Sequence, residues 1–235
     1  MVNSLLTIKH LDAWYHKEKM VLSDLSAELS EREVVGLIGM NGAGKTTFLK
    51  LLSGLSSSYR SERICFHGRP VNLRGRDFKT SRYTVFAEDH SFGYFTFREY
   101  LSYVFSAYKK KLPDVSELVH GFCFEEYVDT LLKDLSTGNQ KKAFLITAFA
   151  LKTELLLLDE PVNGLDFEST EFLYEQIGRY REYGTVLFSS HILESITLTS
   201  DRVLVLENGN IRQTFQRGQI NAANIREVLC CENNV

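Results

Sequence analysis

The feature that most constrains this chain is a glycine-rich segment between a short apolar run and a segment of helical periodicity. Residues 34–38 read Val-Val-Gly-Leu-Ile, and residues 39–47 read Gly-Met-Asn-Gly-Ala-Gly-Lys-Thr-Thr. This is the strand–GxxxxGK(S/T)–helix pattern with both flanks in place. Glycines allow a tight turn whose N–H groups point inward, and the helix that follows presents its positive N-terminal end. The pattern predicts a loop that binds the phosphates of a nucleoside triphosphate.

The side chains of this segment have separate predicted tasks. Lys45 supplies a positive charge for the β- and γ-phosphates, and the hydroxyl of Thr46 can be a ligand of Mg²⁺. The predicted phosphate-binding residues are Gly39, Asn41, Gly42, Ala43, Gly44, Lys45, Thr46 and Thr47. Kinases, GTPases and motor ATPases share such a loop, so it does not by itself say what the triphosphate drives.

Two acidic residues end a second apolar run. Residues 155–158 are four leucines, and Asp159 and Glu160 follow them. Because parallel strands deliver their carboxyl ends to the crevice where ligands bind, we expect Asp159 to hold Mg²⁺ through water and Glu160 to polarise the attacking water. His191 follows another apolar run and is expected to hydrogen-bond the γ-phosphate from the far side. The predicted catalytic residues are therefore Glu160, His191 and Lys45.

Short apolar runs alternate along the chain with longer segments of helical period. The predicted strands are 34–38, 84–86, 155–158, 185–188 and 203–206, and the predicted helices include 44–53, 139–151 and 168–181. Strands that alternate with helices indicate an α/β core with a mainly parallel sheet. Asn208-Gly209 predicts a closing antiparallel hairpin. Residues 5–29 predict an N-terminal antiparallel β subdomain with a turn near residues 16–19.

The segment from about Phe97 to Lys133 is rich in Tyr and Phe, has helical period and lacks a strong strand signal. It predicts a helical subdomain inserted into the core. We expect residues 1–235 to form a single domain. Its α/β core and β subdomain would comprise approximately 1–86 and 152–235, and the helical subdomain approximately 92–150.

Composition excludes several classes of function. Lys+Arg 27 against Asp+Glu 30 gives a formal charge of −3, so no basic field favours a nucleic-acid partner. The longest apolar stretch, near residues 143–151, is far shorter than the ~20 residues that a membrane span needs. The N-terminus lacks the pattern of a secretion signal, and the four cysteines lack metal-ligand spacing. These features predict a soluble intracellular protein with reduced thiols.

Taken together, the motifs resemble those of the nucleotide-binding subunit of ABC transporters, and the resemblance covers almost the whole chain. Residues 135–140, Leu-Ser-Thr-Gly-Asn-Gln, stand where that family carries its LSGGQ signature. Residues 159–166, Asp-Glu-Pro-Val-Asn-Gly-Leu-Asp, resemble its Walker B and D-loop segments. Residues 189–191, Ser-Ser-His, resemble its His switch. The P-loop NTPase fold of that family is therefore the expected fold.

The resemblance implies an ATPase that uses ATP and Mg²⁺ and in which two subunits enclose two nucleotides head to tail. Ser136 and Gly138 would then contact the γ-phosphate bound to the other subunit, and Asp166 would belong to the nucleotide site. A simple helix N-cap at Ser136 or Thr137 is a compatible interpretation. Tyr15 stands where an aromatic residue stacks on adenine, although the adjacent Trp14 could stack instead.

This sequence departs from the family pattern at two places. Thr137 and Asn139 replace a glycine and the glutamine of the signature, and the resulting LSxGxxxK resembles the signatures of ABC-2 type exporters. The glutamine of the Q-loop falls on Ala87, or on Glu88 after a shift of one residue. Since a carboxylate could sense Mg²⁺ or water and an alanine could not, Glu88 is the predicted residue.

The resemblance also implies partners. These are a transmembrane permease subunit and a second ATPase subunit, in a homodimer or a heterodimer, at the inner face of the cell membrane. We expect Phe92, Tyr94 and Phe95 to face the permease in a helix-in-groove contact, unless their rings belong to the core of the helical subdomain. The protein would be cytoplasmic and peripheral on the membrane.

The leading hypothesis is an ATPase that powers export of a peptide, a bacteriocin or a drug-like substrate. A soluble ABC-type ATPase that assembles a complex or a cofactor is one alternative. A nucleotide-binding regulatory subunit with slow hydrolysis is another.

Overall fold

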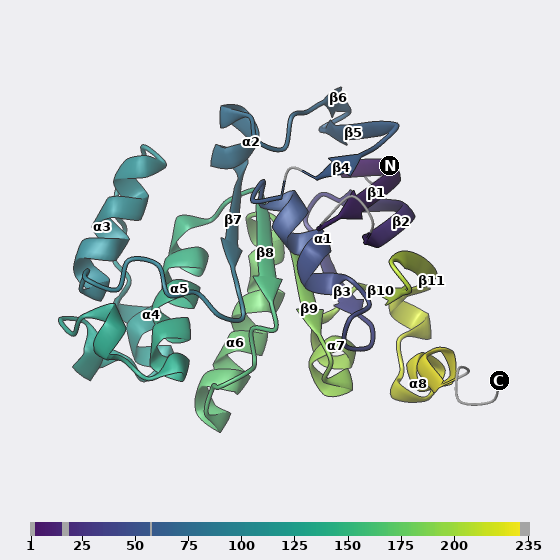
Figure 1. Cartoon of the computed structure of the whole chain (residues 1–235). Coiled ribbons are helices and arrows are strands. Elements are labelled where there is room, and N and C mark those ends of the chain that lie inside the picture. Colours follow the sequence, from purple (N-terminus) through teal and green to yellow (C-terminus); the bar gives the residue numbers. More distant parts are fainter. Residues whose placement is uncertain (1–2, 16–18, 57, 231–235) are drawn as a thin grey trace.

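The computed structural model describes residues 3–15, 19–56 and 58–230, and these form two β-sheets with helices around them (Figure 1). The strands are β1 (Ser4–Trp14), β2 (Met20–Ser30), β3 (Val34–Ile38), β4 (Tyr59–Arg60), β5 (Arg63–Phe66), β6 (Arg69–Pro70), β7 (Arg82–Val85), β8 (Leu155–Asp159), β9 (Thr185–Ser190), β10 (Arg202–Glu207) and β11 (Asn210–Gln216). The helices are α1 (Lys45–Leu52), α2 (Arg76–Ser81), α3 (Phe97–Ala107), α4 (Ser116–Gly121), α5 (Thr137–Leu151), α6 (Phe167–Arg179), α7 (Leu193–Thr199) and α8 (Ala222–Cys230). Short 3₁₀ turns are η1 (Glu125–Tyr127), η2 (Leu132–Asp134), η3 (Tyr180–Glu182) and η4 (Arg217–Gln219).

The larger sheet has the strand order β11-β10-β3-β9-β8-β7. All of its neighbours are parallel except the β10–β11 hairpin at one edge. The smaller sheet has the order β2-β1-β5-β6, with β4 also paired to β1, and it is antiparallel throughout. This is the mixed α/β fold of P-loop NTPases that the sequence predicts.

The apolar runs of the parallel strands are continuous because both faces of the larger sheet are buried. Along β8, Leu155 and Leu157 belong to a core shared with α1 and the antiparallel sheet. Leu156 and Leu158 point the other way, into a core shared with α5, α6, α7 and α8. In Figure 1, α1 lies between the two sheets and α6 lies on the opposite side of the larger one. The two-sided packing makes the carboxyl ends of β3, β8 and β9 a rigid support.

Helix α5 is buried along nearly its whole length because it packs against β7 of the sheet and against both α3 and α4. Helix α3 begins with a capping box, in which Thr96 accepts from the Glu99 N–H and Glu99 accepts from the Thr96 N–H. The ring of Phe97 packs edge-on against Phe124, 5.3 Å between centroids. The segment between β7 and α5 is therefore helical, as predicted. Its division from the core at residues 86 and 92 stays a prediction.

Most predicted element boundaries shift by one or two residues in the structure, those of β7 and α5 among them. The strand predicted at 84–86 is β7, which begins at Arg82 because this residue is already paired with Leu155 of β8. Helix α5 begins at Thr137 rather than at Asn139, since Ser136 is its N-cap. The turn predicted near residues 16–19 falls largely on 16–18, outside the described residues. Within the described part of the chain, no helix has the length and apolarity that crossing a membrane requires.

Candidate active site

The glycine-rich loop connects the carboxyl end of β3 to the first turn of α1. Gly42 and Gly44 have φ angles of 85° and 110°, in the left-handed region that strains other residues. A Cβ atom on Gly39 would lie 2.3 Å from the carbonyl oxygen of Leu206. Asn41, Gly42 and Ala43 line a cavity of about 290 Å³ beside the loop. The loop therefore requires glycine where the triphosphate motif places it.

Lys45 and Thr46 extend from this loop toward the end of β8. The Lys45 side chain is 7% exposed, and its ammonium donates to the Gly39 carbonyl oxygen at 2.7 Å. It also lies 3.8 Å from Oε1 of Glu160. The Thr46 hydroxyl donates to Oδ1 of Asp159 at 3.2 Å. Residues that were each predicted to belong to the nucleotide site are thus brought together across a long sequence separation, Lys45 with Glu160 and Thr46 with Asp159.

Asp159 is held by a residue that the sequence analysis did not single out. The Ser189 hydroxyl donates to Oδ1 of Asp159 at 2.6 Å and accepts from the Glu160 N–H at 3.0 Å. Asp159 and Ser189 face each other in the parallel register of β8 and β9. The position of Ser189 in the Ser-Ser-His segment could have indicated a role in the site. Only the strand register shows which acidic residue Ser189 contacts.

Glu160 has the left-handed φ angle of 47°, and its carboxylate is 14% exposed. Its Oε2 lies 2.7 Å from Nδ1 of His191 and accepts from the His191 N–H at 3.3 Å. The other oxygen, Oε1, faces Lys45. Glu160 therefore lies within reach of both other predicted catalytic residues, with His191 at one carboxylate oxygen and Lys45 at the other.

The signature segment contacts another part of the molecule. The Ser136 hydroxyl accepts from the Asn139 N–H at 3.2 Å, which is the N-cap geometry that the sequence left as a compatible interpretation. A Cβ atom on Gly138 would lie only 2.2 Å from the carbonyl oxygen of Gly164. The start of α5 is therefore packed directly on the loop of residues 160–166.

Asp166 is the N-cap of α6 and accepts from the Ser169 N–H at 2.8 Å. Its other oxygen pairs with Nζ of Lys142 at 2.5 Å. Desolvation raises the pKa of Asp166, but the hydrogen bonds from Lys142 and Ser169 outweigh it and lower the pKa to about 2. Asp166 therefore links the start of α6 to the signature helix α5 through Lys142.

We expect Asp166→Asn to lower the free energy of unfolding at pH 7 but to match the parent protein near pH 2. The pKa of Asp166 is lower in the folded chain than the ~3.9 of an unfolded Asp, so its ionisation stabilises the folded state fully at pH values above ~3.9. This stabilisation is lost as the pH falls from about 4 toward 2. Since the carboxylate is 53% exposed, we expect about 1 kcal/mol at pH 7. Urea unfolding at both pH values measures the effect; an equal difference at both would contradict the assignment.

Tyr15 and Glu88 lie at the borders of the candidate site. The Tyr15 ring is about half exposed, and its hydroxyl lies 2.8 Å from Oγ1 of Thr47. Trp14 instead pairs in the sheet with Met20. Glu88 and Ala87 both line a cavity of about 240 Å³, so this cavity does not distinguish between the two candidate Q-loop residues.

Lys141 was also missed by the sequence analysis. It is almost fully buried in α5, and it donates to the carbonyl oxygens of Glu160 at 3.1 Å and Asn163 at 2.7 Å. It also lines the cavity that contains Glu88. The available signal was a pair of adjacent lysines, Lys141 and Lys142, at the start of an otherwise apolar helix.

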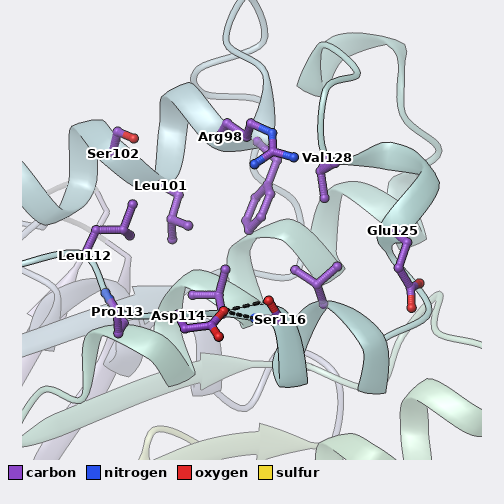
Figure 2. Close-up of a pocket in the computed structure, with 12 residues that line it drawn as sticks. Arg98, Leu101, Ser102, Leu112, Pro113, Asp114, Ser116, Glu125 and Val128 are labelled. Carbon is purple, nitrogen blue, oxygen red and sulfur yellow. Dashed lines mark hydrogen bonds between the residues drawn. The ribbon is translucent and has the colours of Figure 1, made fainter.

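A larger cavity, of about 550 Å³, lies within the helical segment near α3 and α4 (Figure 2). In Figure 2, Asp114 is hydrogen-bonded to Ser116 in the lower part of the view, Arg98 lies at the top and Glu125 at the right. Arg98 is already paired with Asp129 at 2.7 Å. The lining of this cavity also contains the carboxylates of Asp114 and Glu125, so its charge does not suit a triphosphate.

The residues at the loop fit a magnesium nucleotide. Mg²⁺ is usually held by one or two carboxylates together with phosphate oxygens and waters, so it needs no cage of protein ligands. Thr46 and Asp159 offer a hydroxyl and a carboxylate side by side. In the ranges that the structure describes, no group of three or more His, Cys, Asp or Glu side chains is arranged to hold a metal.

The parallel sheet, the glycine-rich loop and the paired acids define a P-loop protein of the nucleotide-binding class. The profile of the family described as ABC transporter matches residues 22–163, more than half of the chain. AlbC of Bacillus subtilis, whose name describes an ABC transporter ATP-binding protein, is 34% identical over 226 residues, which cover 92% of this chain and 93% of AlbC. The chain belongs to the ABC transporter family, as an ATPase and ATP-binding subunit.

Other relatives agree with the family and differ in what their names describe. The phosphate import ATP-binding protein PstB of Mycoplasma genitalium is 27% identical over 239 residues, covering 92% of this chain and 72% of PstB. A solved structure titled as the ATP binding subunit of an ABC transporter superposes with a TM-score of 0.84 and 26% identity, over 96% of this chain and 99% of that one. The family is shared by importers, so membership alone does not give a direction of transport.

Proposed function

We propose that this chain is the ATP-hydrolysing subunit that powers a separately encoded permease. The observation that carries the proposal is the convergence of the carboxyl ends of β3, β8 and β9 on one site. There, Lys45 lies 3.8 Å from Glu160, Glu160 lies 2.7 Å from His191, and Thr46 bonds to Asp159. The proposal assigns one role to each of these side chains.

Glu160 is the proposed general base. His191 holds Oε2 of its carboxylate, so Oε1 remains on the side of Lys45, where the γ-phosphate and the attacking water would lie. A carboxylate in this position orients the water and accepts its proton, and the Lys45 ammonium balances the charge of the phosphates. When bound, a magnesium ion held by Thr46 and Asp159 adds positive charge at the same phosphates.

Tyr15 is the residue that we propose to stack on adenine. Its hydroxyl contact with Thr47 sets the half-exposed ring at the end of the phosphate loop. For the Q-loop we retain Glu88, which lines the cavity beside Lys141, as the residue that senses the metal or its water.

A second ATPase subunit, identical or related, completes the proposed site. Within this chain, the Ser136 hydroxyl accepts from the Asn139 N–H, and Gly138 packs on Gly164. The other N–H groups of the first turn lie at the N-terminal end of α5, a helix of 15 residues. Such a helix end favours a phosphate. We infer that this end meets the γ-phosphate on the partner subunit.

The permease is proposed to dock on the aromatic surface that precedes α3. Phe92 packs against Phe95, Tyr100 and Tyr103, with ring centroids 5.1–5.6 Å apart, so part of its area serves the helical segment itself. Tyr94 is 81% exposed, and the Lys133 ammonium lies over its ring, 4.4 Å from the centroid. Tyr94 is therefore the strongest candidate for the permease contact, with Phe92 and Phe95 beside it.

Export is the proposed direction, and the LSxGxxxK signature is its support. The cargo would be a peptide, a bacteriocin or a drug-like molecule. The subunit would be cytoplasmic and peripheral on the inner face of the cell membrane, and residues 1–235 would act as one ATPase domain.

The test is the co-expression of this chain with a hydrophobic permease encoded beside its gene. We expect the chain to be retained on permease-containing membranes and its ATP turnover to depend on the permease. Tyr94→Asp should weaken this retention by about tenfold or more, since a central aromatic anchor contributes ~2 kcal/mol or more.

Tyr183→Asp is the matched control, because Tyr183 is also an exposed ring covered by a lysine, Lys152, at 3.9 Å. It should leave retention unchanged. A chain that hydrolyses ATP at full rate and stays in the soluble fraction with the permease present would favour the assembly alternative.

A further inference from the structure

Lys141 is a buried cation that has no role in the proposed mechanism. It lies in the second turn of α5, and its side chain is 5% exposed. Burying an ammonium group is unfavourable unless hydrogen bonds and nearby negative charges compensate for the lost hydration. Here the ammonium donates to two main-chain oxygens, those of Glu160 and Asn163. The position therefore serves the loop that follows β8.

The first of these contacts fixes the backbone of the proposed general base. Glu160 has a φ angle of 47°, a conformation that costs a residue with a side chain ~1–3 kcal/mol. Its N–H donates to Ser189 at 3.0 Å, and its carbonyl oxygen accepts from Lys141 at 3.1 Å. The peptide groups on both sides of the Glu160 Cα are thus anchored, which sets the direction of its carboxylate toward His191 and Lys45.

The second contact closes the turn that Glu160 begins. The Asn163 N–H donates to the Glu160 carbonyl oxygen at 3.3 Å, and the Lys141 ammonium bonds to the carbonyl oxygens of both residues. The next residue of the loop, Gly164, packs on Gly138. The signature helix therefore holds residues 160–164 by a cation and by a close backbone contact.

Nearby carboxylates offset part of the cost of burying this cation. Burial lowers the pKa of Lys141, and the carboxylates of Asp159, Glu160 and Glu88 oppose this shift without cancelling it. Glu88 reaches this group from the segment after β7, since it lines the same cavity. The ammonium thus lies among three acids that belong to two different segments of the chain.

We propose that Lys141 is a positioning residue for Glu160, which holds the main chain of residues 160–163 so that the carboxylate faces the nucleotide site. The inference rests on the proposed role of Glu160 as the general base. It assigns to the signature helix a task within its own subunit, in addition to its proposed contact with the partner's nucleotide.

The test compares variants in steady-state ATP hydrolysis by the full chain with its permease, and in the thermal shift caused by ATP. Lys141→Met keeps the apolar stem and removes both hydrogen bonds. We expect kcat to fall about 10- to 100-fold, because small displacements of a catalytic group have effects of this size, with KM and the ATP-induced shift unchanged within about twofold. Lys141→Arg, which retains the charge and the donors, should recover most of the lost kcat.

The control is Lys110→Met. The Lys110 ammonium donates to the carbonyl oxygens of Leu151 and Lys152 at 2.7 and 3.0 Å, so it holds two main-chain oxygens at the other end of α5. This variant should retain the parent kcat. If it lost as much activity as Lys141→Met, or if Lys141→Met lost ATP binding together with turnover, a general structural role would replace the proposal.

A double-mutant cycle separates this inference from the proposed function. If Lys141 acts through Glu160, Lys141→Met should cause no further loss in a Glu160→Gln chain. Additive losses, or a Lys141→Met chain with the parent kcat, would overturn the positioning role. A fully active Glu160→Gln chain would instead overturn the proposed general base itself. Should Lys141→Met fail to fold, Lys141→Gln, which keeps an uncharged donor, enters the same cycle.

Discussion

Glu160→Gln is expected to bind ATP as the parent protein does, to form the nucleotide-bridged dimer and to hydrolyse ATP about 10²- to 10³-fold more slowly. The amide keeps the shape of the side chain and can still contact Nδ1 of His191, 2.7 Å from Oε2 in the parent. It cannot accept a proton from water, and general-base catalysis typically contributes 10²–10⁴-fold. Neutralising Glu160 also leaves Lys45 with one negative neighbour fewer, which should favour the bound triphosphate.

Single-turnover hydrolysis and analytical ultracentrifugation with ATP measure the two halves of this expectation. His191→Ala is the companion variant, because it removes the group that holds Oε2 and keeps the carboxylate. It should lose less turnover than Glu160→Gln. Full activity of the glutamine variant would show that another group activates the water.

Gly138→Ala is expected to reduce ATP turnover by about 10²-fold while the chain still folds. A Cβ atom there would lie 2.2 Å from the Gly164 carbonyl oxygen, and an ordinary contact needs more than 3.4 Å. The obstacle is main chain, so the start of α5 and the loop of residues 160–166 must separate by about 1 Å. A displacement of this size at a catalytic constellation can cost ~10²-fold in rate.

The remaining packing of α5 should keep the folded state, with a loss of stability of about 1–3 kcal/mol from overpacking. Gly218→Ala is the matched control, because a Cβ atom on Gly218 meets nothing within 4 Å. It should change neither turnover nor the unfolding midpoint. Parent-like turnover of Gly138→Ala would mean that the contact between the signature helix and the loop is not needed for catalysis.

The parts of the candidate site that depend on a single segment of the chain could be predicted from the sequence. The turn at Gly42 and Gly44 needs positive φ angles, so the glycines reveal the loop, and Lys45 follows at the start of the helix. The continuous leucines before Asp159 reveal a strand covered on both faces. The alternation of such runs with helical segments was enough to predict the parallel sheet and its closing hairpin.

Contacts between segments were not predictable in the same way. Ser189 reaches Asp159 only because β8 and β9 pair in one particular register. The choice between Ala87 and Glu88 stays a prediction, since both line one cavity. The three aromatic residues before α3 share an apolar composition, yet Tyr94 alone is mostly exposed. Composition cannot separate a ring that fills a local core from a ring that is free to meet a partner.

The class of fold and the chemical groups of the site could be predicted from local sequence, because each motif encodes a local backbone requirement or a local periodicity. The orientation of those groups depends on contacts between distant segments. Glu160 is oriented by Ser189 from a neighbouring strand and by Lys141 from a helix that precedes it in the chain. Serine and lysine side chains make these two contacts, and strand register and helix packing set their partners. A local sequence pattern contains no information about such contacts between distant segments.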